Sequence, residues 1–160
     1  FVSSQQKQFA SEQIQSCAQF PAELARLVLE YNFAKEGIFS TSYAFAAKLA
    51  NGRVLTWGNP GYGGDSSSVQ AELKDVDTIY STQYAFAAKL VNGRVVTWGG
   101  VYEGGNSSSV QAQLKDVDTI YSTGYAFAAK LANGKLIMWG DAGAGGDSSS
   151  VQVELKAVQS

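Results

Sequence analysis

The sequence contains no histidine and a single cysteine, Cys17, so two of the side chains that most often perform catalysis or bind metals are almost missing. No imidazole is present to act as a general base near neutral pH, and Cys17 has no evident activating partner. The carboxylates are scattered and form no pair that the sequence pattern brings together. We therefore expect no enzyme activity, no catalytic residues, no bound metal and no cofactor.

Charge of one sign and long apolar runs are also lacking. The 12 basic and 14 acidic residues give a net charge of −2, with no basic stripe of the kind that binds nucleic acid or a membrane surface. No stretch approaches the roughly 18 apolar residues of a spanning helix, so we expect no direct membrane insertion. The lone cysteine and the lack of a visible signal favour an intracellular location. The start at Phe1 rather than methionine predicts a processed form or an excerpt of a longer protein.

The dominant feature is a unit of 41 residues that occurs three times without insertion or deletion. The copies are residues 38–78, 79–119 and 120–160. Trp57, Trp98 and Trp139 stand at the same position of each copy. A fixed period in the range of about 20–50 residues indicates a repeat architecture, in which one unit cannot bury its apolar face without a neighbour.

Residues 1–37 precede the repeats and are predicted to be helical. Pro21 stands where a helix prefers its first residue. An apolar stripe follows at i, i+3, i+4 and i+7, formed by Leu24, Leu27, Val28 and Tyr31. We expect this segment to cap the exposed end of the first repeat or to dock on another protein.

Within each copy the hydrophobic period changes to two, which predicts β-strands. The first copy reads YAFAAKL, then Asn51-Gly52, then RVLTWG, a pattern typical of a β-hairpin with a type I′ turn. The segment IFST before it predicts a further short strand. Tyr43 shares a face with Phe45, which we interpret as packing, and the repeated tryptophans are interpreted as wedges between units.

A glycine-rich loop and a serine-rich segment follow each tryptophan. Asp65, Asn106 and Asp147 are interpreted as turn or cap residues, since one acid per copy is too few for a calcium loop. Ser67 and Gln70 have capping-box spacing. The apolar residues of 66–76 fit a helical face and a strand face equally well, so a short helical turn and a fourth, outer strand both stay open.

The run A-F-A-A-K-L-x-N-G-[RK]-[VL]-x-x-W-G-x4-G-G resembles the repeats of the regulator of chromosome condensation (RCC) family, whose blades read approximately A-L-x-x-D-G-x-V-x-x-W-G-x-N-x-x-G-Q-L-G. The resemblance covers residues 38–160 and implies the four-stranded blades of a seven-bladed β-propeller. The unit here is shorter, G-Q-L-G is reduced to Gly-Gly, and the family's histidine before the second strand is replaced by Tyr43, Tyr84 and Tyr125.

We therefore expect a mainly β fold of three tandem propeller-blade-like repeats, each with four strands or with three strands and a helical turn. Three copies are fewer than the about four to eight blades of a closed propeller. The chain is then a segment of a larger propeller or an array assembled from several chains. The alternative is a self-closed three-fold β fold, trefoil-like or prism-like.

Two sets of residues are candidates for binding. The first two copies differ most in the loop after W-G, and repeat proteins place binding residues in such loops. The candidates there are Asn59, Tyr62, Val101, Tyr102, Glu103 and Asp141. The second set is a possible anion-binding ring of Lys48, Lys89 and Lys130. Alternatively, these lysines lie on a solvated face and pair with nearby aspartates, namely Asp75, Asp77, Asp116 or Asp118.

These features favour a non-catalytic protein–protein interaction or scaffold module, working through protein partners, self-association or a large complex. The family resemblance also implies nucleotide exchange on a small GTPase, but no residue carries that role over. The alternative is a carbohydrate-binding, lectin-like module with three equivalent sites, which needs exposed aromatic side chains.

Overall fold

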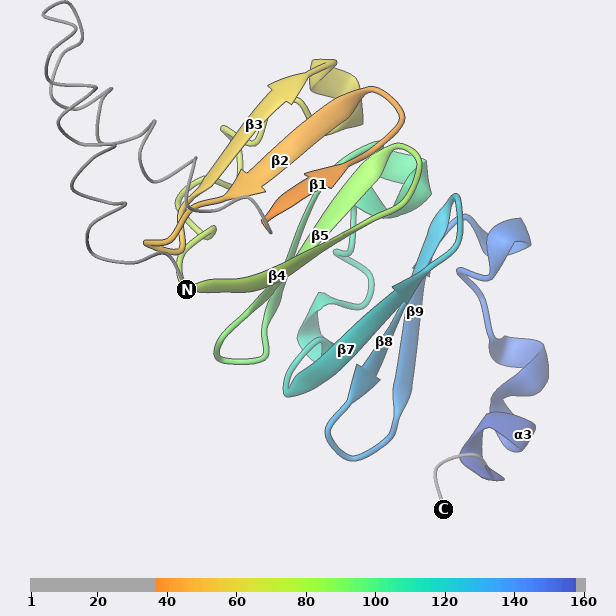
Figure 1. Cartoon of the computed structure of the whole chain (residues 1–160). Helices are drawn as coiled ribbons and strands as arrows, with labels where there is room; N and C mark the ends of the chain where they lie inside the picture. Colours follow the sequence, from red (N-terminus) through yellow and green to blue (C-terminus); the bar gives the residue numbers. More distant parts are fainter. Residues whose placement is uncertain (1–36, 158–160) are drawn as a thin grey trace, which may run out of the picture.

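The computed structural model describes residues 37–157, which form three antiparallel three-stranded sheets in tandem and a short C-terminal helix (Figure 1). The strands are β1 (Ile38–Ser40), β2 (Ala44–Lys48), β3 (Val54–Gly58), β4 (Val76–Ser81), β5 (Ala85–Leu90), β6 (Val95–Gly99), β7 (Val117–Ser122), β8 (Ala126–Leu131) and β9 (Leu136–Gly140), and the helix is α3 (Gln152–Ala157). Each sheet with the segment that follows it is called a blade below. The mainly β prediction is confirmed, while the helices predicted in residues 1–37 lie outside the described residues apart from Gly37.

The predicted hairpins are confirmed, but their turn type differs from the prediction. In the first hairpin the N–H of Gly52 donates to the carbonyl of Leu49, and the N–H of Leu49 donates to the carbonyl of Arg53. Gly52 has a φ of +77°, whereas Asn51 is not among the described residues with positive φ. The turn is therefore the form in which a left-handed glycine bulge follows the turn, and not type I′. Asn51 instead accepts a hydrogen bond from the N–H of Arg53 through its side chain.

The segment 66–76 and its counterparts form helical turns, so the alternative of a fourth, outer strand is wrong. In the first blade the N–H of Leu73 donates to the carbonyl of Val69. The second blade has η3 (Gln111–Gln113) at this position, and the third has η5 (Ser149–Val151), which leads into α3. Each blade is thus three strands plus a helical turn.

Hydrogen bonds explain why these turns stay against their sheet. The hydroxyl of Ser66 donates to the Gln70 side chain (2.9 Å), and the Gln70 amide donates to the carbonyl of Val54 in β3 (3.2 Å). The predicted capping pair of Ser67 with Gln70 is therefore shifted by one residue. Asp65 accepts a hydrogen bond from the N–H of Ser67, which confirms its prediction as a turn residue.

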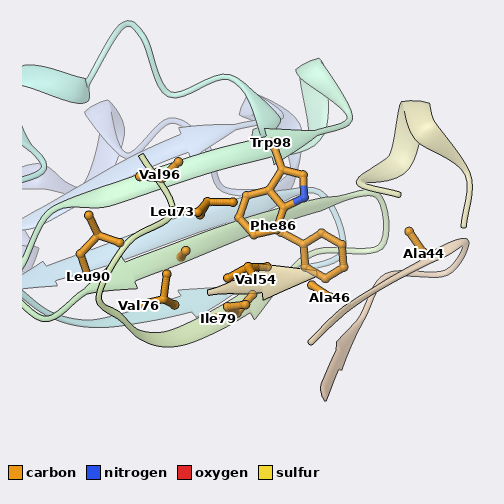
Figure 2. Packing of buried hydrophobic residues seen from close by; sticks show 11 residues of the cluster. Ala44, Ala46, Val54, Leu73, Val76, Ile79, Phe86, Leu90, Val96 and Trp98 are labelled. Carbon is orange, nitrogen blue, oxygen red and sulfur yellow. The ribbon is translucent and has the colours of Figure 1, made fainter. Parts of the chain in front are cut away.

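The core lies between the blades rather than inside any one of them. Successive side chains of a strand point to opposite faces. In β5, Phe86 and Ala88 pack against the first blade, while Ala85 and Ala87 pack against the third. Figure 2 shows the first of these two clusters, in which Leu73 of the first blade lies close to the aromatic residues of the second. The middle sheet is buried on both faces because it has a neighbour on each side.

Each joint between blades is fixed by a tryptophan of the later blade and a glycine of the earlier one. The indole N–H of Trp98 donates to the carbonyl of Gly63 (3.1 Å), and Trp139 donates to Gly104 (3.0 Å). Both indoles are 3% exposed, which supports their interpretation as wedges between units. Gly63 has a φ of +102°, and a Cβ on it would lie 2.5 Å from the ring of Phe86. Only glycine fits this position, because both the backbone conformation and the space exclude a side chain.

The array is open at both ends of its described part. Phe45 and Trp57 in the first blade are 45% and 40% exposed, whereas their counterparts in the second blade are almost fully buried. The first strands β1, β4 and β7 lie next to one another in chain order, and the third sheet does not return to the first (Figure 1). The alternative of a self-closed three-fold fold is therefore wrong.

We expect Gly63→Ala to destabilise the protein by about 2–5 kcal/mol. A left-handed backbone costs a residue with a Cβ about 1–2 kcal/mol, and the displaced Phe86 ring adds about 1–3 kcal/mol. Gly61→Ala is the matched control, since Gly61 has no positive φ and its nearest neighbour would be the side chain of Asn59 at 3.5 Å. Urea unfolding followed by tryptophan fluorescence measures both variants. Equal stability of the two would contradict the assigned role of Gly63.

Candidate functional site

One end of the blades gathers the turns between the first and second strands together with the loops after W-G (Figure 1). The turns are residues 41–43, 82–84 and 123–125. The loops contain η1 (Pro60–Tyr62), η2 (Val101–Gly105) and η4 (Ala142–Ala144). Each turn is followed by a β-strand and each loop follows one, so both are anchored to the sheet.

A threonine fastens each turn to its loop. The hydroxyl of Thr82 accepts a hydrogen bond from the N–H of Ala85 (3.0 Å) and donates one to the carbonyl of Glu103 (3.0 Å). Thr41 and Thr123 make the same contacts, donating to the carbonyls of Tyr62 (3.1 Å) and Ala144 (2.9 Å). The last residue of each variable loop is thus held beside the turn of its own blade.

Backbone hydrogen bonds join the turns of neighbouring blades. The N–H of Ser42 donates to the carbonyl of Gln83 (2.8 Å), and the N–H of Gln83 donates to the carbonyl of Gly124 (2.9 Å). A tyrosine follows each of these three residues in the sequence. The three tyrosines are therefore set in register from blade to blade.

Tyr43, Tyr84 and Tyr125 form a row of packed rings that we call the tyrosine ladder. The ring centroids of Tyr43 and Tyr84 are 5.8 Å apart, and those of Tyr84 and Tyr125 are 5.7 Å apart. Tyr62 from the first variable loop lies 5.2 Å from Tyr43 and 5.0 Å from Tyr84. The rings pack on one another, yet Tyr43 remains 55% exposed and Tyr125 41% exposed. The ladder is an exposed aromatic surface on a rigid base.

Sequence reasoning missed this surface. The interpretation of Tyr43 as a packing residue holds only in part, because its ring packs on the half-buried Tyr84 and the exposed Tyr62 at the surface and not in the core. The strand begins at Ala44, so Tyr43 belongs to the turn. The available signal was the Ser-Thr-x-Tyr pattern, which places an aromatic residue next to a turn-forming threonine.

The six predicted loop residues lie at the same end as the ladder, and they divide into two groups. Tyr62, Val101 and Tyr102 expose apolar surface, most of all Tyr102, which is 82% exposed. Asn59 and Asp141 use their side-chain oxygens to cap the short helices, accepting from the N–H groups of Gly61 and Ala144. Glu103 is held through its backbone by Thr82.

The lysines lie at the opposite ends of the strands from the ladder. The ammonium of Lys48 donates to the carbonyl of Asp77 (2.8 Å) in the next blade. Lys89 donates to the carbonyl of Asp118 (3.0 Å) and forms an ion pair with the carboxylate of Asp77 (2.8 Å), which raises the pKa of Lys89. Lys130 is exposed. The bonds to the carbonyls of Asp77 and Asp118 link neighbouring blades, whereas the ion pair lies within the second blade. Anion binding by the three lysines stays a prediction.

Chemically, the site offers phenol hydroxyls, ring edges and backbone groups. The neighbouring phenol of Tyr125 raises the pKa of Tyr84 above its ordinary value, with further contributions from burial, Tyr43 and Tyr62. Within residues 37–157, no cluster of histidine, cysteine, aspartate or glutamate is arranged to hold a metal ion. No helix in that range is long and apolar enough to cross a membrane.

No protein-family model matches the chain, and no curated protein matches it. Among solved structures it is similar to the CRINKLY WD40 ectodomain of the Arabidopsis thaliana receptor kinase ACR4, with 15% identity, a TM-score of 0.48, and coverage of 64% of this chain and 37% of that one. The ectodomain of the Physcomitrella patens receptor kinase CR4 has 19% identity, a TM-score of 0.44, and coverage of 64% and 28%. Yeast RCC1 (Prp20), in a structure with Kap60 bound, has 17% identity, a TM-score of 0.44, and coverage of 65% and 29%. These neighbours are β-propeller proteins, and the chain spans 28–37% of their length.

We expect Tyr125→Phe to lower the pKa of Tyr84 toward the ordinary tyrosine value of about 10, because it removes the largest cause of the shift. Since the folded chain holds this proton more tightly than the unfolded chain, stability should fall as pH rises through the unfolded pKa toward the folded one. Titration of ¹³C-labelled tyrosine by NMR measures the pKa, and Tyr84→Phe assigns the signal. An unchanged pKa of Tyr84 in Tyr125→Phe would show that the phenols do not interact.

Proposed function

We propose that the chain is a non-catalytic protein-binding module, built of shortened RCC-type blades, that docks a protein segment on the tyrosine ladder and the loops beside it. The observation that carries the proposal is the row of packed rings formed by Tyr43, Tyr84 and Tyr125, in which Tyr43 and Tyr125 are exposed and to which the first variable loop adds Tyr62. Tyrosine is enriched in protein interfaces because it combines a large apolar ring with a hydrogen-bonding hydroxyl.

The rigidity of this surface supports a binding role. Ring stacking limits the rotamers of the tyrosines, the backbone bonds from Ser42 and Gln83 hold the turns together, and the threonines fix the loops. A surface that is already ordered loses little conformational entropy when a partner binds. More of the free energy gained from the new contacts then contributes to the affinity, because less of it offsets lost entropy.

The geometry of the rings favours a protein partner over a carbohydrate. Neighbouring rings of the ladder pack on one another, nearly parallel for Tyr43 and Tyr84 and tilted for Tyr84 and Tyr125, so each inner ring face is partly covered by the next ring. A lectin-like site would need an exposed ring face on which a sugar can lie. The tryptophans do not supply three equivalent ones, since Trp98 and Trp139 are buried in the joints between blades.

The variable loops provide a basis for specificity. Val101 and Tyr102 project from η2 on the second blade, whereas the corresponding loop of the third blade, η4, is made of alanine and glycine. Each blade thus presents a ladder tyrosine at the equivalent position, but the loop beside that tyrosine differs from blade to blade. A partner that contacts several blades can therefore bind in one register only.

The test uses the full chain in a selection from a random peptide display library, with a panel of oligosaccharides screened in parallel. We expect selected peptides to lose about 30-fold or more in affinity for the double variant Tyr43→Ser, Tyr125→Ser, a loss typical of interface hot spots of about 2 kcal/mol. Fluorescence polarisation of labelled peptides measures the affinities. Val91→Ser is the control, because Val91 is 74% exposed and follows the end of β5 opposite to Tyr84.

Two outcomes would count against the proposal. One is peptide binding that the double tyrosine variant leaves unchanged or weakens no more than Val91→Ser does. The other is oligosaccharide binding that depends on the ladder tyrosines in the absence of any selected peptide, which would favour the lectin-like alternative.

A further inference from the structure

A groove open to solvent runs along the outer edge of the second sheet. The strand order of this sheet is β4-β5-β6, so β6 is its outermost strand. The groove is lined by β6, by the helical turn of the first blade with Val69 and Glu72, and by that of the second blade with Ser108 and Gln111. Its volume is about 370 Å³. The edge of β6 is thus accessible between two helical turns.

The hydrogen bonds of β6 leave the backbone of Thr97 directed toward this edge. In an antiparallel pair of strands, residues that bond to the partner strand alternate with residues that do not. The N–H of Gly100 donates to the carbonyl of Tyr84, and at the other end the N–H of Leu90 donates to Arg94. Thr97 lies at an alternate position between Arg94 and Gly100, so its N–H and C=O point away from β5. Neither group has a hydrogen-bond partner among the described residues.

The backbone groups on either side of Thr97 are already covered. The carbonyl of Val95 accepts a hydrogen bond from the Gln111 amide (3.0 Å). Gly105 lies against Gly99, since a Cβ on Gly105 would be 2.5 Å from the Gly99 carbonyl. The Thr97 hydroxyl is also engaged, donating to the carbonyl of Gly105 (3.0 Å). What the edge offers is one free N–H and C=O pair on a single residue, which matches one residue of an extended backbone.

We propose that this groove binds an extended segment of a partner protein, which adds to the second sheet as a fourth strand and carries a lysine or arginine facing Glu72. One residue of the segment exchanges two hydrogen bonds with Thr97, and its side chain lies on the same face as that of Thr97, beside Ser107. The residues before and after it point to the opposite face, where Val96 packs near Val69 of the first blade. An alternating segment therefore fits the groove.

Glu72 supplies the charge complementarity with such a segment. Among the described residues that line the groove, it is the only charged one. It is exposed, and no lysine or arginine of the described part of the chain forms an ion pair with it. The second copy has Gln113 at this position, which accepts a hydrogen bond from Lys135, and the third copy has Met138 where β6 has Thr97. These differences assign the strand-binding groove to the second blade.

A library of acetylated and amidated heptapeptides tests the groove, with threonine at every odd position and a random residue at every even one. We expect the full chain to select peptides with a lysine or arginine at one random position and an apolar residue at the next. Fluorescence polarisation of labelled peptides measures the affinities. A library from which no peptide binds with a Kd below about 1 mM would overturn the proposal.

N-methylated forms of a selected peptide show whether its backbone pairs with Thr97. The N–H groups of alternate residues in an extended peptide point to the same edge. Methylating the threonine nitrogens should weaken binding by about 10-fold or more, whereas methylating the other nitrogens should change it by less than about 3-fold. By NMR, hydrogen exchange of the Thr97 N–H should slow by about 10-fold or more with excess peptide. Equal losses from the two methylated peptides, or unchanged exchange at Thr97, would contradict the added strand.

Reversal of the charge at Glu72 tests the predicted ion pair. Glu72→Lys should weaken binding of the basic peptide by about 10-fold, and a peptide with glutamate in place of its basic residue should recover the loss. Glu154→Lys is the matched control, because Glu154 occupies the same position of the third copy, in α3. An equal loss in both variants would overturn the role of Glu72.

The double variant Tyr43→Ser, Tyr125→Ser separates this groove from the proposed function. The groove does not rest on the tyrosine ladder, so this variant should bind the selected peptide within about 2-fold of the unchanged chain. A loss in the tyrosine variant with full binding by Glu72→Lys would assign the peptide to the ladder and overturn the groove.

Discussion

The contact on which the structure depends is the joint in which a tryptophan of one blade donates a hydrogen bond to a glycine carbonyl of the blade before it. A three-stranded sheet with apolar residues on both faces cannot be stable alone, because at least one face would remain in water. In the joint this apolar face is covered, because large aromatic side chains of one blade pack on a glycine of the other. Phe86 and Trp98 supply the apolar area, and Gly63 supplies a surface without a Cβ into which the rings fit. The alanines of β5 have the same effect along the strand, since small side chains let two sheets approach closely.

Much of this arrangement follows from the sequence because it is encoded by short-range patterns. The period of 41 residues, the alternation in YAFAAKL and the Asn-Gly pairs predict three blades with a hairpin in each, and the positions of Trp98 and Trp139 predict a wedge. The type of turn was harder to predict from the sequence, because Asn-Gly fits both a type I′ turn and a turn closed by a glycine bulge. The choice between a helical turn and an outer strand for residues 66–76 stayed open because their apolar residues fit both periodicities, and the capping serine was also ambiguous. Spacing alone does not distinguish Ser66 from Ser67.

The candidate site was less predictable for a physical reason. The alternation of apolar residues indicates which residues face a core, whereas the tyrosine ladder is ordered by hydrogen bonds of turns and loops, both between blades and within one blade. The bonds from Ser42 to Gln83 and from Thr82 to Glu103 connect residues that are far apart in sequence or belong to different blades. The variable loops could be found, since they are where the copies differ. That they lie beside Tyr43 and Tyr84 became visible only once the blades were placed side by side.

Repeated residues in unequal surroundings show where the third blade differs from the other two. Thr56 and Thr97 each hydrogen-bond a serine of the following helical turn, but the third copy has Met138 at this position, and its segment continues into α3. The third blade therefore differs in its outer segment while its glycine loop keeps the conformation of the other two. The left-handed Gly145 is explained within the third blade itself, because it ends η4 and its N–H donates to the carbonyl of Ala142.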